Sequence, residues 1–157
     1  MKKFLSLLIS FILIFSVLTC PVSAENNYTI VSETTECLEN GYYLVTTFVV
    51  EDNDVTRATS SKTGSKTVVL YNEDKEAMVT MKLTATFSYT GSSATCTNVS
   101  PTFTVHNSYW RVTKSTGTKS GNKGIGEFTA KHYWLGIVTQ TKDITITITC
   151  SNTGVLS

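Results

Sequence analysis

Strict alternation of apolar and polar residues is the feature that most limits how this chain can fold. Residues 143–150 read Asp-Ile-Thr-Ile-Thr-Ile-Thr-Cys, which places the isoleucines and the cysteine on one parity and the threonines on the other. Residues 79–89 alternate in the same way. Successive side chains of a strand point to opposite faces, so both segments are predicted to be half-buried β-strands.

The rest of the chain repeats this pattern in shorter pieces. Strand-like runs recur at 28–36, 42–51, 67–71, 94–99, 109–112 and 125–133, and no segment has the helical period. Short strands separated by polar turns are typical of all-β sandwiches and barrels. We predict an all-β, antiparallel β-sandwich, immunoglobulin-like or similar, while a barrel would give the same pattern.

The first 24 residues have the layout of a secretory signal peptide. Residues 1–3 give a positive start, residues 4–18 are apolar, and Val22-Ser23-Ala24 offers a cleavage site. We therefore expect a secreted, extracellular protein. The alternative is a lipoprotein signal with lipid on Cys20, which would anchor the protein at the cell surface, and membrane contact is expected in that case alone.

Composition divides the mature chain into three parts. Residues 25–51 form a predicted N-terminal hairpin arm, because the Asn-Gly pair at 40–41 accepts the positive φ angles of a tight turn. Residues 52–66 are small and polar without a period, which predicts a flexible linker. Residues 67–157 form the predicted sandwich domain, in which residues 114–124 are expected to be a loop.

Charge and motifs exclude several kinds of partner and site. The mature chain carries eleven basic and twelve acidic residues, for a net charge near −1. That balance gives no reason to expect binding to nucleic acid or to a membrane surface. No Cys-x-x-Cys or His-x-x-x-His motif occurs, and Asp52-Asn53-Asp54 lacks the remaining ligands of a calcium loop. No cofactor or metal is therefore predicted.

Four segments carry a resemblance to known proteins: Thr63–Thr67, Tyr71–Asp74, Leu83–Cys96 and Thr147–Ser157. Together they resemble a group of small secreted, Ser/Thr-rich β-proteins of Gram-positive anaerobic bacteria. That group has no known activity. The resemblance implies secretion, a β-rich fold and a Cys96–Cys150 pair, and it implies no catalytic or ligand-binding residue.

Three cysteines remain after signal cleavage. Cys150 ends the apolar parity of its strand and Cys96 lies on another predicted strand, so Cys96 is also the partner that the strand pattern favours. Disulfides are common in secreted domains. Cys37 is left over, either as a free, partly exposed thiol or as the site of an intermolecular disulfide.

Catalytic groups are scarce in this chain. A nucleophilic triad needs a base that is oriented by a third group, and the chain has two histidines, His106 and His132. A glycoside hydrolase needs two facing carboxylates. Asp143 lies on the outer parity with the threonines, so Glu127 and Asp143 are predicted to form a surface pair at most.

Two Tyr-Trp pairs supply the candidate binding residues. Neighbouring residues of a strand face opposite ways, so one member of each pair is expected in the core. Trp110 is expected to be packed. Trp134, with Tyr133, precedes a predicted turn, where an exposed ring could stack on a sugar or contact a partner protein. The alternative is that Trp134 merely shields the turn.

Three functions are compatible with these residues. The first is a non-catalytic binding or interaction module for a glycan or cell-surface component, with Trp134 and Tyr133 as the binding residues. The second is a small secreted hydrolase that uses His106 or His132. The third is a self-associating surface protein that is linked through Cys37.

Overall fold

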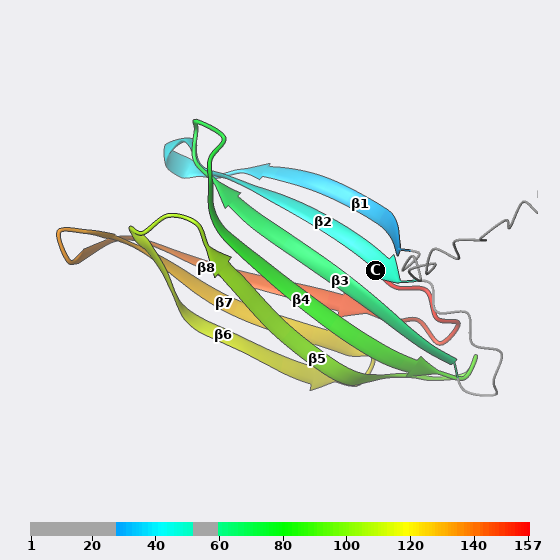
Figure 1. The fold of residues 1–157 in the computed structure, drawn as a ribbon. Helices are drawn as coiled ribbons and strands as arrows, with labels where there is room; N and C mark the ends of the chain where they lie inside the picture. The colour runs from blue at the N-terminus through cyan, green and yellow to red at the C-terminus, as the bar shows by residue number, and fades with distance from the viewer. Residues whose placement is uncertain (1–27, 52–59) are drawn as a thin grey trace, which may run out of the picture.

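The computed structural model describes residues 28–51 and 60–157. The predicted signal peptide 1–24, Cys20 and the Asp52-Asn53-Asp54 turn lie outside the described residues. Within the described residues the chain forms eight strands and one 3-10 turn (Figure 1). They are β1 (Tyr28–Cys37), η1 (Glu39–Gly41), β2 (Tyr43–Glu51), β3 (Ser60–Tyr71), β4 (Ala77–Tyr89), β5 (Ala94–Val105), β6 (Trp110–Ser120), β7 (Lys123–Trp134) and β8 (Ile137–Thr149).

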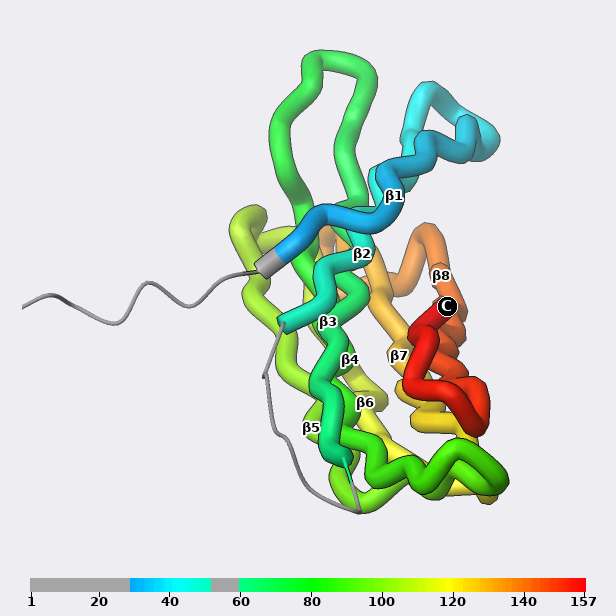
Figure 2. Tube along the Cα trace, turned by 90° about the vertical axis from the view of Figure 1, so that its right-hand side faces the viewer, coloured from blue at the N-terminus to red at the C-terminus, as the bar shows by residue number. Residues whose placement is uncertain are grey.

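The strands make two antiparallel sheets, which confirms the predicted all-β sandwich. One sheet has the order β1-β2-β3-β4-β5 and the other the order β6-β7-β8. Figures 1 and 2 show the three-stranded sheet lying as a second layer against the five-stranded one. Within each sheet every strand pairs with its neighbours in sequence, and the chain crosses between the sheets once, from β5 to β6. Each sheet is therefore a simple meander, whereas immunoglobulin domains have Greek-key connections.

The core lies between the two sheets, on the faces that the alternating segments predict. In β4, Val79, Met81, Leu83 and Phe87 are completely buried. In β8, Ile146 and Ile148 are buried on the facing side. Each of these side chains stabilises the fold by roughly 1.5–3 kcal/mol through removal of apolar surface from water.

Residue size along β7 sets how closely the sheets approach. At its start, a Cβ atom on Gly124 would lie 2.7 Å from the Cβ of Ala85, and one on Gly126 would lie 2.9 Å from a methyl carbon of Leu83. Only glycine fits such a close approach of backbone to side chain. Further along β7 the space between the sheets holds the buried ring of Phe128, and next to His132 it holds the buried ring of Trp110 from β6.

The prediction of a flexible linker is wrong for residues 60–66, and with it the prediction that the hairpin is a separate arm. These residues are the first half of β3, which pairs with β2 from Tyr43↔Tyr71 to Glu51↔Thr63. The β1–β2 hairpin is therefore an integral part of the five-stranded sheet, and the sandwich includes residues that precede position 67. Phe48 and Val50 of β2 are buried in the core.

Lys66 explains why this half of β3 has no apolar signal. Its ammonium donates a hydrogen bond of 2.9 Å to the carbonyl of Thr147 and lies 4.9 Å from the centre of the Phe48 ring. Burial lowers the pKa of Lys66. A lysine can pack its aliphatic stem at the edge of the core while its ammonium bonds a carbonyl. A pattern of apolar and polar residues counts such a lysine as exposed, so it does not predict this strand.

The predicted loop at 114–124 is wrong as well. β6 continues to Ser120 and β7 starts at Lys123, so the loop shrinks to a turn at Gly121 and Asn122. β6 is an outer strand and most of its residues are exposed, which removes the apolar alternation. Gly117 faces the other sheet, and a Cβ atom there would lie only 2.8 Å from a methyl carbon of Val99. This inward position therefore holds a glycine and adds no apolar residue to the pattern.

Candidate functional site

The β7–β8 turn places the predicted binding residues at one end of the sandwich. Leu135 and Gly136 form the turn with φ angles of 49° and 82°, and Trp134 pairs with Ile137 across it. Figure 1 shows this turn as the tip at the far left, beyond the ends of the neighbouring strands. Trp134 is 54% exposed, so the ring stands in solvent as the turn position predicts.

A chain of aromatic rings connects Trp134 with the core. Trp110 is buried and contacts the ring of Tyr42 edge-on at 5.8 Å. The Trp110 ring lies 5.3 Å from His132, and Tyr109 lies 5.6 Å from Trp134 and 6.1 Å from His132. The exposed rings of Tyr109 and Trp134, which we call the aromatic cluster, are thus linked to packed rings, and they come from the residue before β6 and the last residue of β7.

Tyr133 lies on the opposite face of the hairpin. The Arg111 guanidinium lies 4.9 Å from the centre of the Tyr133 ring, a cation–π contact. Arg111 pairs with Lys131 across β6 and β7, and Tyr133 pairs with Val138 across β7 and β8. The predicted pair Tyr133 and Trp134 therefore belongs to two surfaces that meet at the tip.

Three apolar side chains that the sequence reasoning missed complete the tip. Leu135 is 87% exposed, Ile137 69% and Val138 42%. The signal was present in the sequence, because Trp-Leu-Gly-Ile-Val at 134–138 puts apolar residues on both parities around a turn. We call residues 134–138 the apolar tip.

The two histidines lie in different places and each contacts a threonine. His106 Nε2 is 2.9 Å from the hydroxyl of Thr80, and His132 Nδ1 is 2.6 Å from the hydroxyl of Thr139. A triad also needs a group that orients the base. Among the hydrogen bonds of the described residues, no carboxylate meets either ring.

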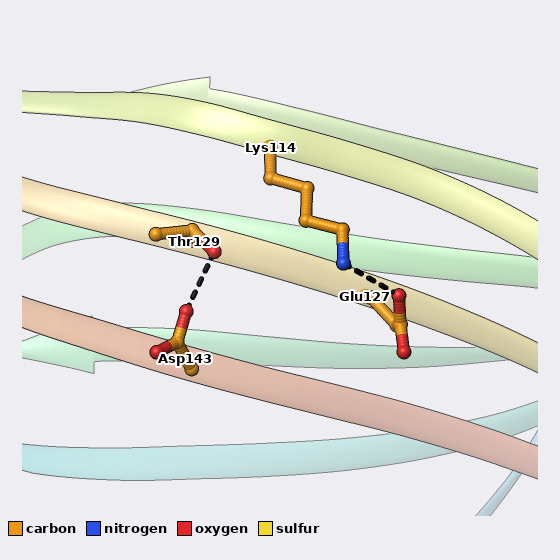
Figure 3. A network of polar contacts seen from close by, with 4 residues as sticks. All are labelled: Lys114, Glu127, Thr129 and Asp143. Atoms are coloured by element: carbon orange, nitrogen blue, oxygen red, sulfur yellow. Dashed lines mark hydrogen bonds and ion pairs between the residues drawn. The ribbon is translucent and has the colours of Figure 1, made fainter.

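The two carboxylates on the outer face are each engaged with a neighbouring side chain (Figure 3). Lys114 donates to Glu127 at 2.7 Å, and this hydrogen bond, followed by the lysine charge, lowers the pKa of Glu127. Thr129 donates to Asp143 at 2.6 Å. This is the surface arrangement that the strand parity predicts.

The predicted Cys96–Cys150 disulfide is absent from the structure. Both residues are free thiols and both are buried. Each sulfur contacts a carbonyl of its own segment instead, Cys96 at Asn98 (3.4 Å) and Cys150 at Ser151 (3.3 Å). Burial raises the pKa of both thiols, and the charge of an ionised Cys96 would raise that of Cys150 further.

Two other surfaces are candidates for contact with a partner. Cys37 is an exposed free thiol at the end of β1, the outermost strand of the larger sheet. A groove of about 300 Å³ lies between the β1–β2 hairpin and β8. It is lined by Glu36, Leu38, Leu44, Thr141, Lys142, Asp143, Ile144 and Thr145.

Within residues 28–51 and 60–157, no three His, Cys, Asp or Glu side chains gather closely enough to hold a metal ion. In the same part of the chain no helix has the length and hydropathy to cross a membrane. No family model matches the chain, and no curated protein or solved structure is significantly similar to it. The resemblance to secreted proteins of Gram-positive anaerobes stays a prediction.

Proposed function

We propose that the protein is a secreted, non-catalytic binding module that recognises its ligand with the surface at the β7–β8 end. The observation that carries this proposal is the 54% exposure of Trp134 on an ordered strand, in contact with the half-exposed ring of Tyr109. Large exposed aromatic surfaces that are fixed in position are typical of recognition sites.

The scaffold supports such a role. Recognition benefits from side chains that are already ordered before the ligand arrives, because less entropy is lost on binding. Trp134 ends a strand of twelve residues, and its neighbour Tyr109 lies directly before buried Trp110. The ligand class that we propose is a glycan or another cell-surface component, since a flat ring accepts the apolar face of a sugar.

The proposed setting is extracellular, in agreement with the signal peptide that the sequence predicts at 1–24. In that setting we place a disulfide between Cys96 and Cys150. The N–H of Cys96 donates to the carbonyl of Gly121 and that of Cys150 to the carbonyl of Asn122, so both cysteines border the same turn. Peptide mapping of secreted, non-reduced protein tests this, and two free thiols in that material would contradict it.

The experiment for the proposed function compares three variants in a pull-down on a glycan array and on cell envelopes. Trp134→Ala should lose most binding and keep the wild-type unfolding temperature, because the ring is half in solvent. Phe103→Ala is the matched control, since Phe103 is 46% exposed on β5. It should bind like the wild type.

Trp110→Ala calibrates the stability readout. Trp110 is 2% exposed, and its truncation should cost roughly 3–5 kcal/mol of unfolding free energy, as large-to-small core substitutions do. If Trp134→Ala unfolds the protein instead, the ring is structural and the proposed site is lost. Equal binding of Trp134→Ala and Phe103→Ala would also contradict the proposal.

A further inference from the structure

Leu135 lies at a position where a leucine side chain does not stabilise the fold. Its φ of 49° lies in the left-handed region, which costs an L-residue with a Cβ atom conformational energy. Asn, Asp or Gly usually fill this position of a two-residue hairpin turn. The side chain is 87% exposed, so packing within the chain does not offset that strain. A strained, exposed leucine points to a contact outside the folded chain.

The apolar tip is hydrophobic on both faces of the hairpin. Trp134 and Ile137 are paired on one face, while Val138 pairs with Tyr133 on the other. Leu135 closes the turn between them. The result is a narrow projection with apolar side chains all around it, a shape that enters a soft apolar medium rather than receiving a ligand in a hollow.

Aromatic and basic side chains follow behind the tip. Tyr109 contacts Trp134, and Tyr133 carries the Arg111 guanidinium over its ring. Lys131 lies opposite Arg111 in the register. Aromatic rings favour the interface between lipid headgroups and hydrocarbon, and basic residues favour anionic headgroups. From the turn towards the sandwich, the side chains are first apolar and then aromatic and basic. A lipid surface has the same order, from hydrocarbon through the interface to the headgroups.

The charge of the smaller sheet supports the same partner. Residues 110–149 contain six basic and two acidic residues, for a formal charge of +4. Arg111, Lys131 and Lys142 lie in the half of this sheet next to the tip, whereas Lys119 and Lys123 flank the β6–β7 turn at its other end. The half next to the tip is therefore complementary to anionic headgroups, although acidic residues of the β1–β2 and β3–β4 turns lie at the same end of the sandwich.

We infer that the apolar tip inserts into the apolar layer of a lipid bilayer that carries anionic headgroups, with Arg111 and Lys131 at the headgroup level. This inference rests on the proposed function and names the ligand of the same surface as lipid. The side chains of Leu135, Ile137 and Val138 cannot form hydrogen bonds, so they cannot bind the hydroxyl groups of a glycan. They gain free energy when they leave water for hydrocarbon. The insertion is shallow, because the tip comprises a single turn and its two flanking pairs.

The test uses the mature chain and vesicles of phosphatidylcholine with or without phosphatidylglycerol. The chain has two tryptophans, and Trp110 is already buried, so a shift of emission to shorter wavelength reports Trp134. We expect this shift and co-sedimentation with the vesicles that contain phosphatidylglycerol. Binding should weaken with added salt, because screening reduces attraction between exposed charges.

A matched pair of substitutions locates the insertion. Ile137→Thr and Ile30→Thr make the same change at sites that are 69% and 62% exposed, one at the tip and one on β1. Threonine suits both strands, so both variants should fold. Ile137→Thr should weaken vesicle binding by about tenfold, the loss expected for one inserted aliphatic side chain. Ile30→Thr should bind like the wild type.

Three results would overturn the inference. The first is equal vesicle binding by the two threonine variants. The second is protein that sediments with the vesicles while the emission wavelength of Trp134 does not change. The third is binding to cell envelopes or glycans, lost in Trp134→Ala, together with no vesicle binding, and in that case the proposed function stands while lipid is excluded as the ligand. Failure of the proposed function itself is separate, because it appears as no Trp134-dependent binding to any surface.

Discussion

Leu135 and Asn40 hold nearly the same left-handed backbone, each followed by a glycine, with φ values of 49° and 62°. At 40–41 the chain uses Asn-Gly, the pair that suits this geometry best, whereas at 135–136 it uses Leu-Gly. A bulky residue in the left-handed region costs roughly 1–2 kcal/mol. The leucine is therefore retained at the expense of stability.

Leu135→Asn should accordingly raise the free energy of unfolding by about 1 kcal/mol, because asparagine relieves the strain without loss of core contacts. Chemical denaturation of the two proteins measures the difference. A lower stability of Leu135→Asn would show that the leucine side chain stabilises the fold, and its exposure would need another explanation.

The buried thiols give the reduced protein a pH dependence of known sign. Burial raises the pKa of Cys96 and Cys150, so the unfolded chain ionises first as pH rises. Their contribution to stability is complete below the ordinary thiol pKa of about 8.5 and is lost as pH increases through the folded values. Lys66, with its lowered pKa, acts in the opposite direction at alkaline pH.

The difference between two proteins isolates the thiol contribution. Under reducing conditions, the unfolding free energy of the wild type should fall more steeply above neutral pH than that of the Cys96→Ala/Cys150→Ala double variant. Lys66 is common to both and cancels in the comparison. Parallel pH profiles would contradict the assigned cause.

Among the elements, the strands whose inward positions are all apolar could be predicted from the sequence. β4 and β8 are examples, because both alternate cleanly and their inward residues from Val79 to Phe87, and Ile146 and Ile148, are buried as the pattern requires, with Ile144 partly buried. Of β3 and β6 only residues 67–71 and 110–112 were predicted as strand, because the inward positions of the remaining parts include Gly64, Lys66 and Gly117. In those strands the partner sheet supplies the apolar contact, and that contact is invisible in a single segment.

The candidate site was predictable in part for a similar reason. Trp134 was found because it precedes a turn, and its exposure follows from that position. Tyr109 joins it only through the pairing of β6 with β7, and the apolar tip needs both flanks of the turn to be read together. Side chains that gather from different strands have no common sequence signal.

The β1–β2 hairpin gives a prediction at the scale of the element. A chain that starts at Ser60 loses Phe48 and Val50 from the core, each worth roughly 1.5–3 kcal/mol, out of a typical total of 5–15 kcal/mol. It should lose cooperative thermal unfolding. A chain that starts at Leu38 keeps β2 and lacks the exposed β1, and it should stay folded. Cooperative unfolding of the chain that starts at Ser60 would contradict this and show that the hairpin is a separable arm.

For the whole molecule, the distribution of charge matters more than its sum. A net charge near −1 gives no reason to expect a charged partner, yet residues 110–149 carry +4 while most acidic residues precede position 77. The two regions lie in different sheets, because β1 to β3 belong to one sheet and β6 to β8 form the other. The acidic β1–β2 and β3–β4 turns still lie at the end of the sandwich that carries the tip, so Arg111 and Lys131 are the cations on which attraction to an anionic surface depends.

The most direct test of the central claim is hydrogen–deuterium exchange of the mature chain on the surface that captures it, glycan, envelope or vesicle. The account predicts added protection at the β7–β8 tip and around Tyr109, with no change in β1. Protection confined to β1, or to the groove between Leu44 and Ile144, would contradict it. In that case the ligand binds β1 or the groove that β8 lines, and the exposed tip is not the recognition surface.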